Sequence, residues 1–233
     1  MLEEHIKSGA DITAVCTRQP QAVPRTGTYF TLSAEGFLAD AWVGESVRGC
    51  LSLEVYVLSA RLLLSLIEHC ASHGIWSFSG GVLGAMTTSL KIAPWFFSGY
   101  AARFQAVEDY YARSMDLLDP AVRQDLFAPG REVRTKDRSD PSTYYGPESA
   151  CANSLVADGC VIEGQVRDSI LFRGVRVEAG AQVSGCILMQ GVTISREACL
   201  NFAVADKNAL IHPGRMLMGH QSYPLVIAKN AVI

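Results

Sequence analysis

The stretch from Ser154 to Gly219 decides the fold, because it is built from one short unit that recurs. The successive units are SLVADGCVIEG (154–164), SILFRGVRVEAG (169–180), CILMQGVTI (186–194) and the weaker AVADKNALIHPG (203–214). Each unit places short β-branched or aliphatic segments on either side of a turn residue. No segment is long enough, or periodic enough at 3.6 residues, to form a helix, so the stretch is predicted to be all β.

The turn residues of these units set the period of the repeat. Gly159, Gly174, Gly191 and Asn208 lie 15, 17 and 17 residues apart, and glycine and asparagine adopt a left-handed turn at least cost. One coil of this length cannot bury its own apolar face, so coils must stack. We therefore predict a parallel β-helix of the hexapeptide type. An antiparallel β-sandwich is the alternative, but a sandwich gives no reason for Ser/Cys-Ile-Leu-x-x-Gly-Val to recur at one spacing.

The repeat also predicts which side chains face the inside of the β-helix. We expect aliphatic residues, cysteines and alanines to point inward, and Ile170, Ile187 and Val204 to form one inward apolar ladder across three coils. The side chains expected to point outward are Arg173, Arg176, Gln190 and Arg196. A repeat of this kind indicates a scaffold and a means of assembly, and it carries no chemistry by itself.

Composition excludes several classes of partner. The chain has 233 residues, 49% of them hydrophobic, and its net charge of -3 leaves no bulk field to attract nucleic acid or an anionic membrane. The start of the chain has no basic and apolar signal segment, and the uncharged stretch 74–90 is too short and too polar to span a bilayer. Seven cysteines without a Cys-x-x-Cys pair, with Cys160, Cys186 and Cys199 expected inward, indicate reduced thiols and the cytoplasm.

The first half of the chain has the pattern of an α/β domain. The sequence predicts a helix over 2–8 ended by Gly9, a buried strand over 12–16, two short strands over 29–32 and 37–40 around a turn at Gly36, and a central strand over 50–58. Ser59 is expected to cap a helix over 60–69. A chain that opens with a helix feeding a core strand resembles the middle of an α/β unit, so we expect further strands upstream.

The middle of the chain is harder to predict. No structure is predicted for 74–90, although Gly80, Gly81 and Gly84 are expected to form a flexible turn. A strand is predicted over 91–97 and a helix over 107–118, closed by Asp119-Pro120. Alternating charges over 131–142 indicate a solvated linker. The predicted domains are an α/β domain over 1–130, a linker over 131–150 and the β-helix over 151–233.

Three segments together resemble the ADP-glucose pyrophosphorylase (glucose-1-phosphate adenylyltransferase) family, and most of all its GlgD-type partner subunit. These segments are EHIKSGADIT (4–13), VEDYYARSMDLL (107–118) and NSLVADGCVIEG (153–164) with its continuation to Val177. The resemblance implies a Rossmann-like nucleotidyltransferase domain joined to a left-handed β-helix, in a homo- or heterotetramer. It also implies transfer of an adenylyl group from ATP to glucose 1-phosphate with magnesium.

The chain departs from the active members of that family at three places. It has no Gly-rich phosphate loop ending in Arg-Leu, so roughly the first third of the family's length is missing. The family's Glu-Lys-Pro has no counterpart in FLADAWVG (37–44), so the lysine that binds the sugar phosphate is lost. Arg103 stands where the family places a magnesium-binding aspartate, and a guanidinium offers only hydrogen-bond donors.

One family contact is kept, and its neighbour is changed. Ser52 matches the serine of the sugar-contacting strand, so the resemblance implies a substrate contact there, whereas Glu54 replaces the glycine of that strand. A carboxylate at this position is expected to repel a phosphosugar. We therefore expect no catalytic residue in this chain, no cofactor of its own, and magnesium only in a catalytic partner.

The leading hypothesis is a non-catalytic, regulatory or structural subunit of the glycogen-making adenylyltransferase, pairing with a catalytic subunit or with itself. A hexapeptide acyltransferase is the alternative enzyme, with His212 or His220 as the candidate base. A third hypothesis is a module whose β-helix only makes subunit contacts. The basic residues of the linker are candidates for binding a phosphorylated effector: Arg131, Arg134, Lys136 and Arg138.

Overall fold

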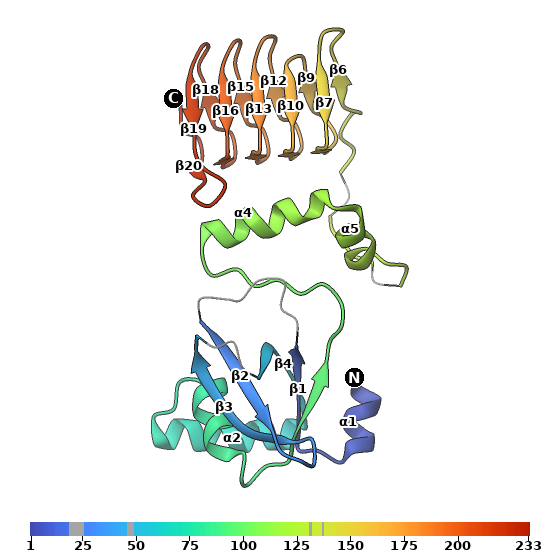
Figure 1. Cartoon of the computed structure of the whole chain (residues 1–233), viewed down its shortest axis with the longest axis vertical. Coiled ribbons are helices and arrows are strands. Elements are labelled where there is room, and N and C mark those ends of the chain that lie inside the picture. The colour runs from blue at the N-terminus through green and yellow to red at the C-terminus, as the bar shows by residue number, and fades with distance from the viewer. Residues whose placement is uncertain (19–25, 46–48, 131, 137) are drawn as a thin grey trace. The chain divides into compact units, whose positions relative to one another are not determined.

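The computed structural model describes residues 1–18, 26–45, 49–130, 132–136 and 138–233. Its contacts divide the chain into two compact units, Met1–Arg103 and Phe104–Ile233. Figure 1 shows an α/β unit made by the first part and a stack of β coils made by the second. Within the described ranges, no helix combines the length and the apolar character that a membrane crossing needs.

The first unit is built on one five-stranded sheet with the order β3-β2-β4-β1-β5. The strands are β1 (Ile12–Thr17), β2 (Gly27–Leu32), β3 (Leu38–Gly44), β4 (Cys50–Leu58) and β5 (Ile92–Phe96). Strand β1 lies between β4, to which it is antiparallel, and β5, to which it is parallel, and all six of its residues are buried. The predicted strands and the turn at Gly36, whose φ is 86°, are confirmed.

Helices of the first unit bear out part of the prediction. Helix α1 (Leu2–Ser8) ends at Gly9 in the left-handed conformation, as expected. Helix α2 (Ala60–His73) begins at Ser59, whose hydroxyl accepts a hydrogen bond from the Leu62 N–H, and it runs four residues beyond the predicted end, to Gly74. The extension follows from the glycine, because Gly74 at φ 65° is the first residue that supplies a left-handed cap.

Gly80, Gly81 and Gly84, in the stretch 74–90, lie in helical backbone, so the flexible turn expected there is wrong. Residues Phe78–Leu83 form the π-helix η1, followed by the short helix α3 (Gly84–Met86). The Ser77 hydroxyl caps η1 by accepting a hydrogen bond from the Gly80 N–H. Val82 and Leu83 are fully buried in the core beneath the sheet, and that burial holds glycine-rich backbone in a helix against its propensity.

The second unit begins with a helical segment. Helix α4 (Val107–Met115) continues as the 3-10 turn η2 (Asp116–Leu118), so the predicted helix over 107–118 is confirmed with a tightened last turn. Asp119-Pro120 closes this helix after Leu118, as expected, with Asp119 in an extended conformation. Asp119 also caps a further helix that the sequence did not predict, α5 (Pro120–Leu126), by accepting a hydrogen bond from the Ala121 N–H, and proline is well suited to a first helical position.

The remainder of this unit is a parallel β-solenoid of the left-handed, hexapeptide-repeat type, which confirms the predicted fold class. Sheet B contains β6 (Tyr144–Tyr145), β9 (Val161–Ile162), β12 (Arg176–Val177), β15 (Thr193–Ile194) and β18 (Leu210–Ile211). Sheet C contains β7 (Ala150–Ala152), β10 (Gln165–Arg167), β13 (Gln182–Ser184), β16 (Cys199–Asn201) and β19 (Met216–Met218). Sheet D contains β8 (Leu155–Val156), β11 (Ile170–Leu171), β14 (Ile187–Leu188), β17 (Ala203–Ala205) and β20 (Leu225–Ile227).

The four turn residues that set the repeat all have positive φ, between 58° at Asn208 and 74° at Gly159. The interior is apolar and is filled by residues of the strands and of the turns between them; along sheet D, Leu171, Leu188 and Ala205 follow one another. Of the four side chains predicted to point outward, Arg176, Gln190 and Arg196 are exposed and Arg173 is half-exposed. The domain limits 1–130, 131–150 and 151–233 stay a prediction, while α4 packs as part of the second unit.

The ladder of Ile170, Ile187 and Val204 exists, but it faces the opposite way from the prediction. These residues pair in register on adjacent strands of sheet D. Ile187 and Val204 belong to a separate cluster with Tyr111 of α4, outside the solenoid core. The Tyr111 hydroxyl donates a hydrogen bond of 2.6 Å to the Gly185 carbonyl oxygen. Because α4 covers the outer face of sheet D, the outer ladder is buried like the residues inside the solenoid. The alternation of side chains along a strand cannot by itself tell which of two buried faces points inward.

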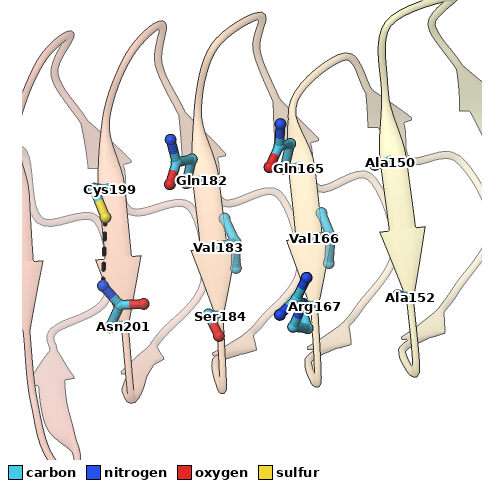
Figure 2. Close-up of a pocket in the computed structure, with 10 residues that line it drawn as sticks. All are labelled: Ala150, Ala152, Gln165, Val166, Arg167, Gln182, Val183, Ser184, Cys199 and Asn201. Carbon is cyan, nitrogen blue, oxygen red and sulfur yellow. Dashed lines mark hydrogen bonds between the residues drawn. The ribbon is translucent and has the colours of Figure 1, made fainter.

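The outer face of sheet C carries two rows of side chains, which Figure 2 shows from close by. Cys199 belongs to one of these rows, next to Gln182 in register, and it is half-buried. Its expected inward position is therefore wrong, because the inward residue of β16 is the adjacent Leu200. Cys160 and Cys186 are inward as predicted, and burial raises the pKa of the Cys186 thiol to about 12.

Candidate functional site

A cavity of about 580 Å³ opens in the first unit, on the side of the sheet where β1 ends and β4 begins. Its wall is formed by the end of β1, by β4 and by the segment that follows β5. The lining residues are Thr17, Leu51, Ser52, Leu53, Glu54, Tyr100, Ala101, Ala102 and Arg103. Ser52 and Arg103, which sequence comparison singled out from segments 51 residues apart, therefore line the same cavity.

Ser52 is almost completely buried, with 1% of its surface exposed. Its hydroxyl lies 3.2 Å from the Tyr56 hydroxyl and accepts a hydrogen bond of 3.1 Å from the Glu54 N–H. The serine is thus held in place by the strand that carries it. A direct contact from Ser52 to a substrate stays a prediction.

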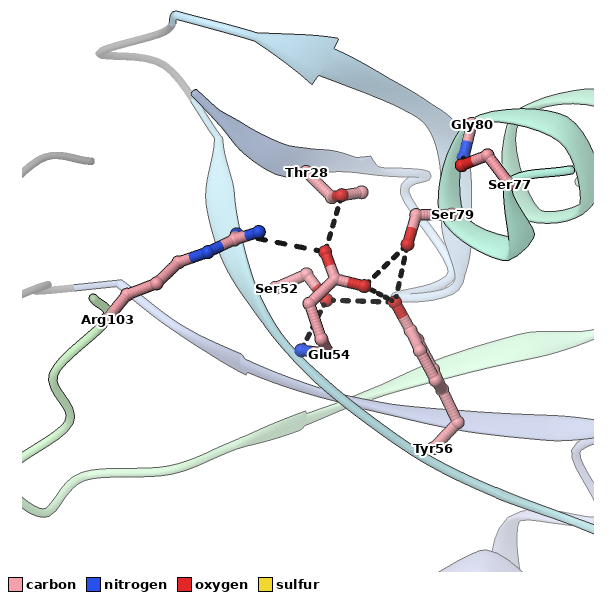
Figure 3. A network of polar contacts seen from close by, with 8 residues as sticks. All are labelled: Thr28, Ser52, Glu54, Tyr56, Ser77, Ser79, Gly80 and Arg103. Carbon is pink, nitrogen blue, oxygen red and sulfur yellow. Dashed lines mark hydrogen bonds and ion pairs between the residues drawn. The ribbon is translucent and has the colours of Figure 1, made fainter. Parts of the chain in front are cut away.

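Glu54 is the centre of a polar network that the sequence did not predict (Figure 3). One carboxylate oxygen accepts a hydrogen bond of 2.6 Å from the Thr28 hydroxyl. The other accepts hydrogen bonds of 2.8 Å from Tyr56 and 2.5 Å from Ser79. Three hydroxyl donors on one carboxylate form a charge-assisted network, which is stronger than a set of neutral hydrogen bonds.

Charge in this network is set by burial and hydrogen bonding together. Burial opposes ionisation of Glu54, but the bonds from Ser79, Thr28 and Tyr56 and the charge of Arg103 outweigh it and lower the pKa of the carboxyl group. Burial, with the negative charge of Glu54, raises the pKa of the Tyr56 hydroxyl to about 12. Glu54 is therefore ionised and Tyr56 is protonated at neutral pH.

The backbone at Glu54 is irregular. Its φ is 56°, a left-handed conformation that costs a non-glycine residue about 1 kcal/mol or more. Strand β4 bulges here: Ser52 and Tyr56 pair with Cys16 and Ala14, so three residues of β4 oppose the single residue Val15. This conformation explains why glycine suits the position in the family that the sequence resembles. In this chain the same bulge directs a glutamate side chain towards the Thr28, Tyr56 and Ser79 hydroxyls.

Arg103 faces the same carboxylate. The distance from its Nη1 atom to Glu54 Oε1 is 3.9 Å, with about a third of each side chain exposed. The arginine at the expected metal position and the glutamate at the expected glycine position thus compensate each other's charge. Glu54 is accordingly not the isolated repulsive charge that the sequence suggested, because its charge is matched by a neighbour and by three donors.

The site does not fit a magnesium ion. Arg103 can only donate hydrogen bonds, and the Glu54 carboxylate is already bound by three hydroxyl groups. Among the residues that the structure describes, no group of three or more His, Cys, Asp or Glu side chains could hold a metal. No step of a metal-dependent reaction can therefore be derived from this cavity.

Thr28, Tyr56 and Ser79 contact Glu54 although the sequence does not predict a role for any of them. Ser79 comes from η1, in the segment for which no structure was predicted. Its signal was weak: the pattern Ser-Phe-Ser-Gly-Gly places a capping serine, Ser77, two residues ahead of it. Thr28 and Tyr56 lie in predicted strands, but a β-bulge was needed to bring Glu54 within reach of both.

The other candidates lie apart from this cavity. Arg134, Lys136 and Arg138 are exposed in irregular backbone, whereas Arg131 lies outside the described residues, so effector binding by this linker stays a prediction. His212 is exposed next to the turn at Pro213-Gly214, and the Nδ1 atom of the exposed His220 lies 2.8 Å from the Ser222 hydroxyl. An acyltransferase base needs a position beside a substrate cleft, and the surroundings of these two histidines give that alternative no support.

The network leads to a prediction about pH. Because the pKa of Glu54 is lowered on folding, ionised Glu54 stabilises the fold above its unfolded pKa, near 4.5, and this contribution is lost as the pH falls through the folded value. The difference in free energy of unfolding between the wild type and Glu54→Gln should thus be constant near neutral pH and shrink below about pH 4.5. Urea titrations across this range would measure it. A difference that grows towards low pH would contradict the prediction.

Comparison with known proteins supports the resemblance. The model of the family described as "GlmU-like, C-terminal hexapeptide" matches residues 142–222. The chain is 38% identical over 181 residues to the glycogen biosynthesis protein GlgD of Bacillus subtilis (strain 168), which covers 78% of this chain and 52% of that protein. It is 40% identical over 181 residues to GlgD of Geobacillus stearothermophilus, with the same coverage.

The relatives also include proteins named as the enzyme glucose-1-phosphate adenylyltransferase. The chain is 30% identical over 188 residues to the glucose-1-phosphate adenylyltransferase of Geobacillus stearothermophilus, covering 78% of this chain and 49% of that protein. The chain therefore spans about half the length of the curated relatives it matches.

Proposed function

Because the chain belongs to the ADP-glucose pyrophosphorylase (glucose-1-phosphate adenylyltransferase) family and is similar to GlgD proteins of glycogen biosynthesis, we propose that it acts in glycogen biosynthesis. Its proposed role is that of a non-catalytic, regulatory or structural subunit, which pairs with a catalytic adenylyltransferase chain. The names of the GlgD relatives support the process, and the geometry of the cavity supports the non-catalytic role.

The observation that carries this proposal is the pairing of Arg103 with Glu54. Adenylyl transfer develops negative charge on phosphoryl oxygens, and enzymes stabilise that charge with metal ions and cationic side chains. Here the cation at the metal position is engaged 3.9 Å from a carboxylate, and that carboxylate is held by three donors. A phosphosugar entering the cavity would have to compete with Glu54 for Arg103. The lysine expected for the sugar phosphate is also missing from 37–44.

Arg103 and Glu54 depend on each other, because each compensates the charge of the other. Replacing the metal aspartate alone would leave Glu54 unpaired, and replacing the glycine alone would place a bare carboxylate beside the sugar. Both changes together give a neutral, internally bonded wall, which preserves the fold of the cavity without its chemistry. Retained structure beside lost catalytic groups is the pattern expected of a subunit kept for assembly or regulation.

The test is an assay of pyrophosphate release from ATP and glucose 1-phosphate with magnesium. We expect no turnover by the purified chain alone, because each missing group removes stabilisation of phosphoryl charge. Mixed with a catalytic adenylyltransferase chain, it should alter the substrate affinity or the effector response of that chain. The control is the catalytic chain with an equal concentration of an unrelated β-helix protein.

Two results would count against this role. Pyrophosphate release by the isolated chain that disappears in an Arg103→Ala variant would show that the cavity is catalytic. A catalytic chain whose kinetics and sedimentation are unchanged by addition of this chain would show that the two do not work together.

A further inference from the structure

The pair formed by Arg103 and Glu54 leaves a gap between its two charged groups. Their separation of 3.9 Å is short enough for an ion pair but too long for a hydrogen bond. Glu54 Oε1 accepts one hydrogen bond, from the Thr28 hydroxyl, whereas a carboxylate oxygen can accept two. Figure 3 shows Arg103 on one side of the carboxylate, with Tyr56 and Ser79 bonded to the other oxygen on the opposite side. Within the described part of the chain, one acceptor position of Oε1 therefore remains for a ligand beside the arginine.

A hydroxyl group matches this gap, because it can accept one hydrogen bond and donate another. Placed between the two side chains, it accepts from the Arg103 guanidinium and donates to Glu54 Oε1, as a bridging water does. An ionised phosphate cannot make this bridge, since its oxygens only accept hydrogen bonds. It would also bring a second negative charge next to the Glu54 carboxylate, which repels it. The pair thus favours a neutral ligand with hydroxyl groups over an anionic one.

The remainder of the cavity wall suits the same kind of ligand. Among the described residues that line the cavity, Glu54 and Arg103 are the only charged ones, so the wall carries no net charge. Leucine and alanine side chains add apolar surface beside them: Leu51, Leu53, Ala101 and Ala102. The volume of about 580 Å³ is typical of small-molecule sites, which combine apolar walls with a few placed polar groups. A monosaccharide presents the matching surface, with hydroxyl groups around its edge and C–H groups on its two faces.

We propose that this cavity binds a neutral glucosyl unit, with one sugar hydroxyl bridging Arg103 and Glu54. The neutral, polyhydroxylated class of ligand follows from the geometry of the pair and from the lining of the cavity. The choice of glucose among such sugars rests on the proposed function, because glycogen is a polymer of glucose. The cavity then detects unphosphorylated sugar, either free or at the end of a glucan chain.

The first experiment compares two ligands that differ at one group. Methyl α-D-glucoside and α-D-glucose 1-phosphate share the sugar ring and carry a methyl or a phosphoryl group on the anomeric oxygen. In ligand-observed NMR titrations of the full chain near neutral pH, the Kd of the glucoside should be at least about tenfold lower than that of the phosphosugar. Equal or tighter binding of glucose 1-phosphate, or no binding of the glucoside at millimolar concentrations, would overturn the inference.

Variants of the pair should change this preference. Glu54→Gly removes the carboxylate, allows the left-handed backbone at φ 56° and leaves Arg103 without its counter-charge. The Kd of the glucoside should then rise at least about tenfold, while that of glucose 1-phosphate should fall. Arg103→Ala should weaken the glucoside by a similar factor and leave the phosphosugar weakly bound. Arg61→Ala, which removes an exposed arginine of α2 outside the cavity, is the matched control and should change neither Kd.

The two substitutions in the pair give independent readouts of where the sugar lies. Arg103 is exposed in a segment without regular structure, so Arg103→Ala tests the site even if Glu54→Gly fails to fold. Glucoside binding that is unchanged in Arg103→Ala would show that the sugar binds elsewhere and would overturn the inference. Maltotriose then identifies the source of the glucosyl unit. Tighter binding of maltotriose than of the glucoside would assign the site to the end of a glucan, and equal or weaker binding would assign it to the free sugar; both support the inference.

These measurements are separate from the test of the proposed function, because they record binding without turnover. A chain that binds neither the glucoside nor glucose 1-phosphate, and releases no pyrophosphate, would overturn this inference while leaving the non-catalytic role intact. A chain that binds glucose 1-phosphate more tightly than the glucoside and converts it would overturn both.

Discussion

Replacing Ile187 by alanine is expected to lower the free energy of unfolding by about 2 to 5 kcal/mol, because it leaves a cavity at a completely buried position. Ile187 is the middle residue of the outer ladder on sheet D, between Ile170 and Val204. Its side chain lies against Tyr111 of α4. The cavity should therefore form between the helix and the solenoid. Hydrogen exchange should then show a lower free energy of opening for the amides of α4 than for those of the coils.

Leu188→Ala provides the matched comparison. This residue is adjacent, equally buried and inside the solenoid, so the loss of stability should be similar, about 2 to 5 kcal/mol, but spread over the coils. Gln190→Ala, at an exposed turn, should cost under about 0.5 kcal/mol. Urea titrations with hydrogen exchange of α4 amides would separate the three variants. Equal loss of α4 protection in Ile187→Ala and Leu188→Ala would contradict the assignment of inner and outer faces.

Glu54→Ala is expected to destabilise the first unit by about 1 to 3 kcal/mol, since Thr28, Tyr56 and Ser79 lose their shared charged acceptor. Glu54→Gly should cost about 1 kcal/mol less than Glu54→Ala. Both remove the carboxylate, but only glycine adopts a φ of 56° without strain. The pair of variants thus separates the energy of the network from that of the backbone.

Thermal or urea unfolding of both variants beside the wild type would provide the measurement. The order of stability should be wild type, then glycine, then alanine. If alanine were as stable as glycine, the left-handed backbone at this position would not persist in solution. If glycine matched the wild type, the network around Glu54 would contribute nothing, and the Arg103 pairing would lose its significance for the proposed function.

The local pattern of the sequence determined most of the elements of both units, with η1, α3 and α5 as exceptions. Repeats such as CILMQGVTI (186–194), with glycine or asparagine at left-handed turns, require stacked coils because one coil cannot bury its own apolar face. Caps were equally local: Ser59 and Gly9 lie within three residues of the groups they satisfy. Ser52 and Arg103 could also be identified from the sequence, because each was matched to a position in a family motif without knowledge of its spatial neighbours.

Tertiary structure decided which face of each strand is covered and which side chains meet. Ile187 and Leu188 are both buried, and only the position of α4 shows that one of them points out of the solenoid. Glu54 acquires its partners through a bulge in β4 and a π-helix in a glycine-rich segment. Those contacts join residues 25 and 26 positions apart, with one partner, Arg103, 49 positions away. Pattern and propensity act over a few residues, whereas the charge and burial of this carboxylate depend on groups brought together only when the sheet is complete.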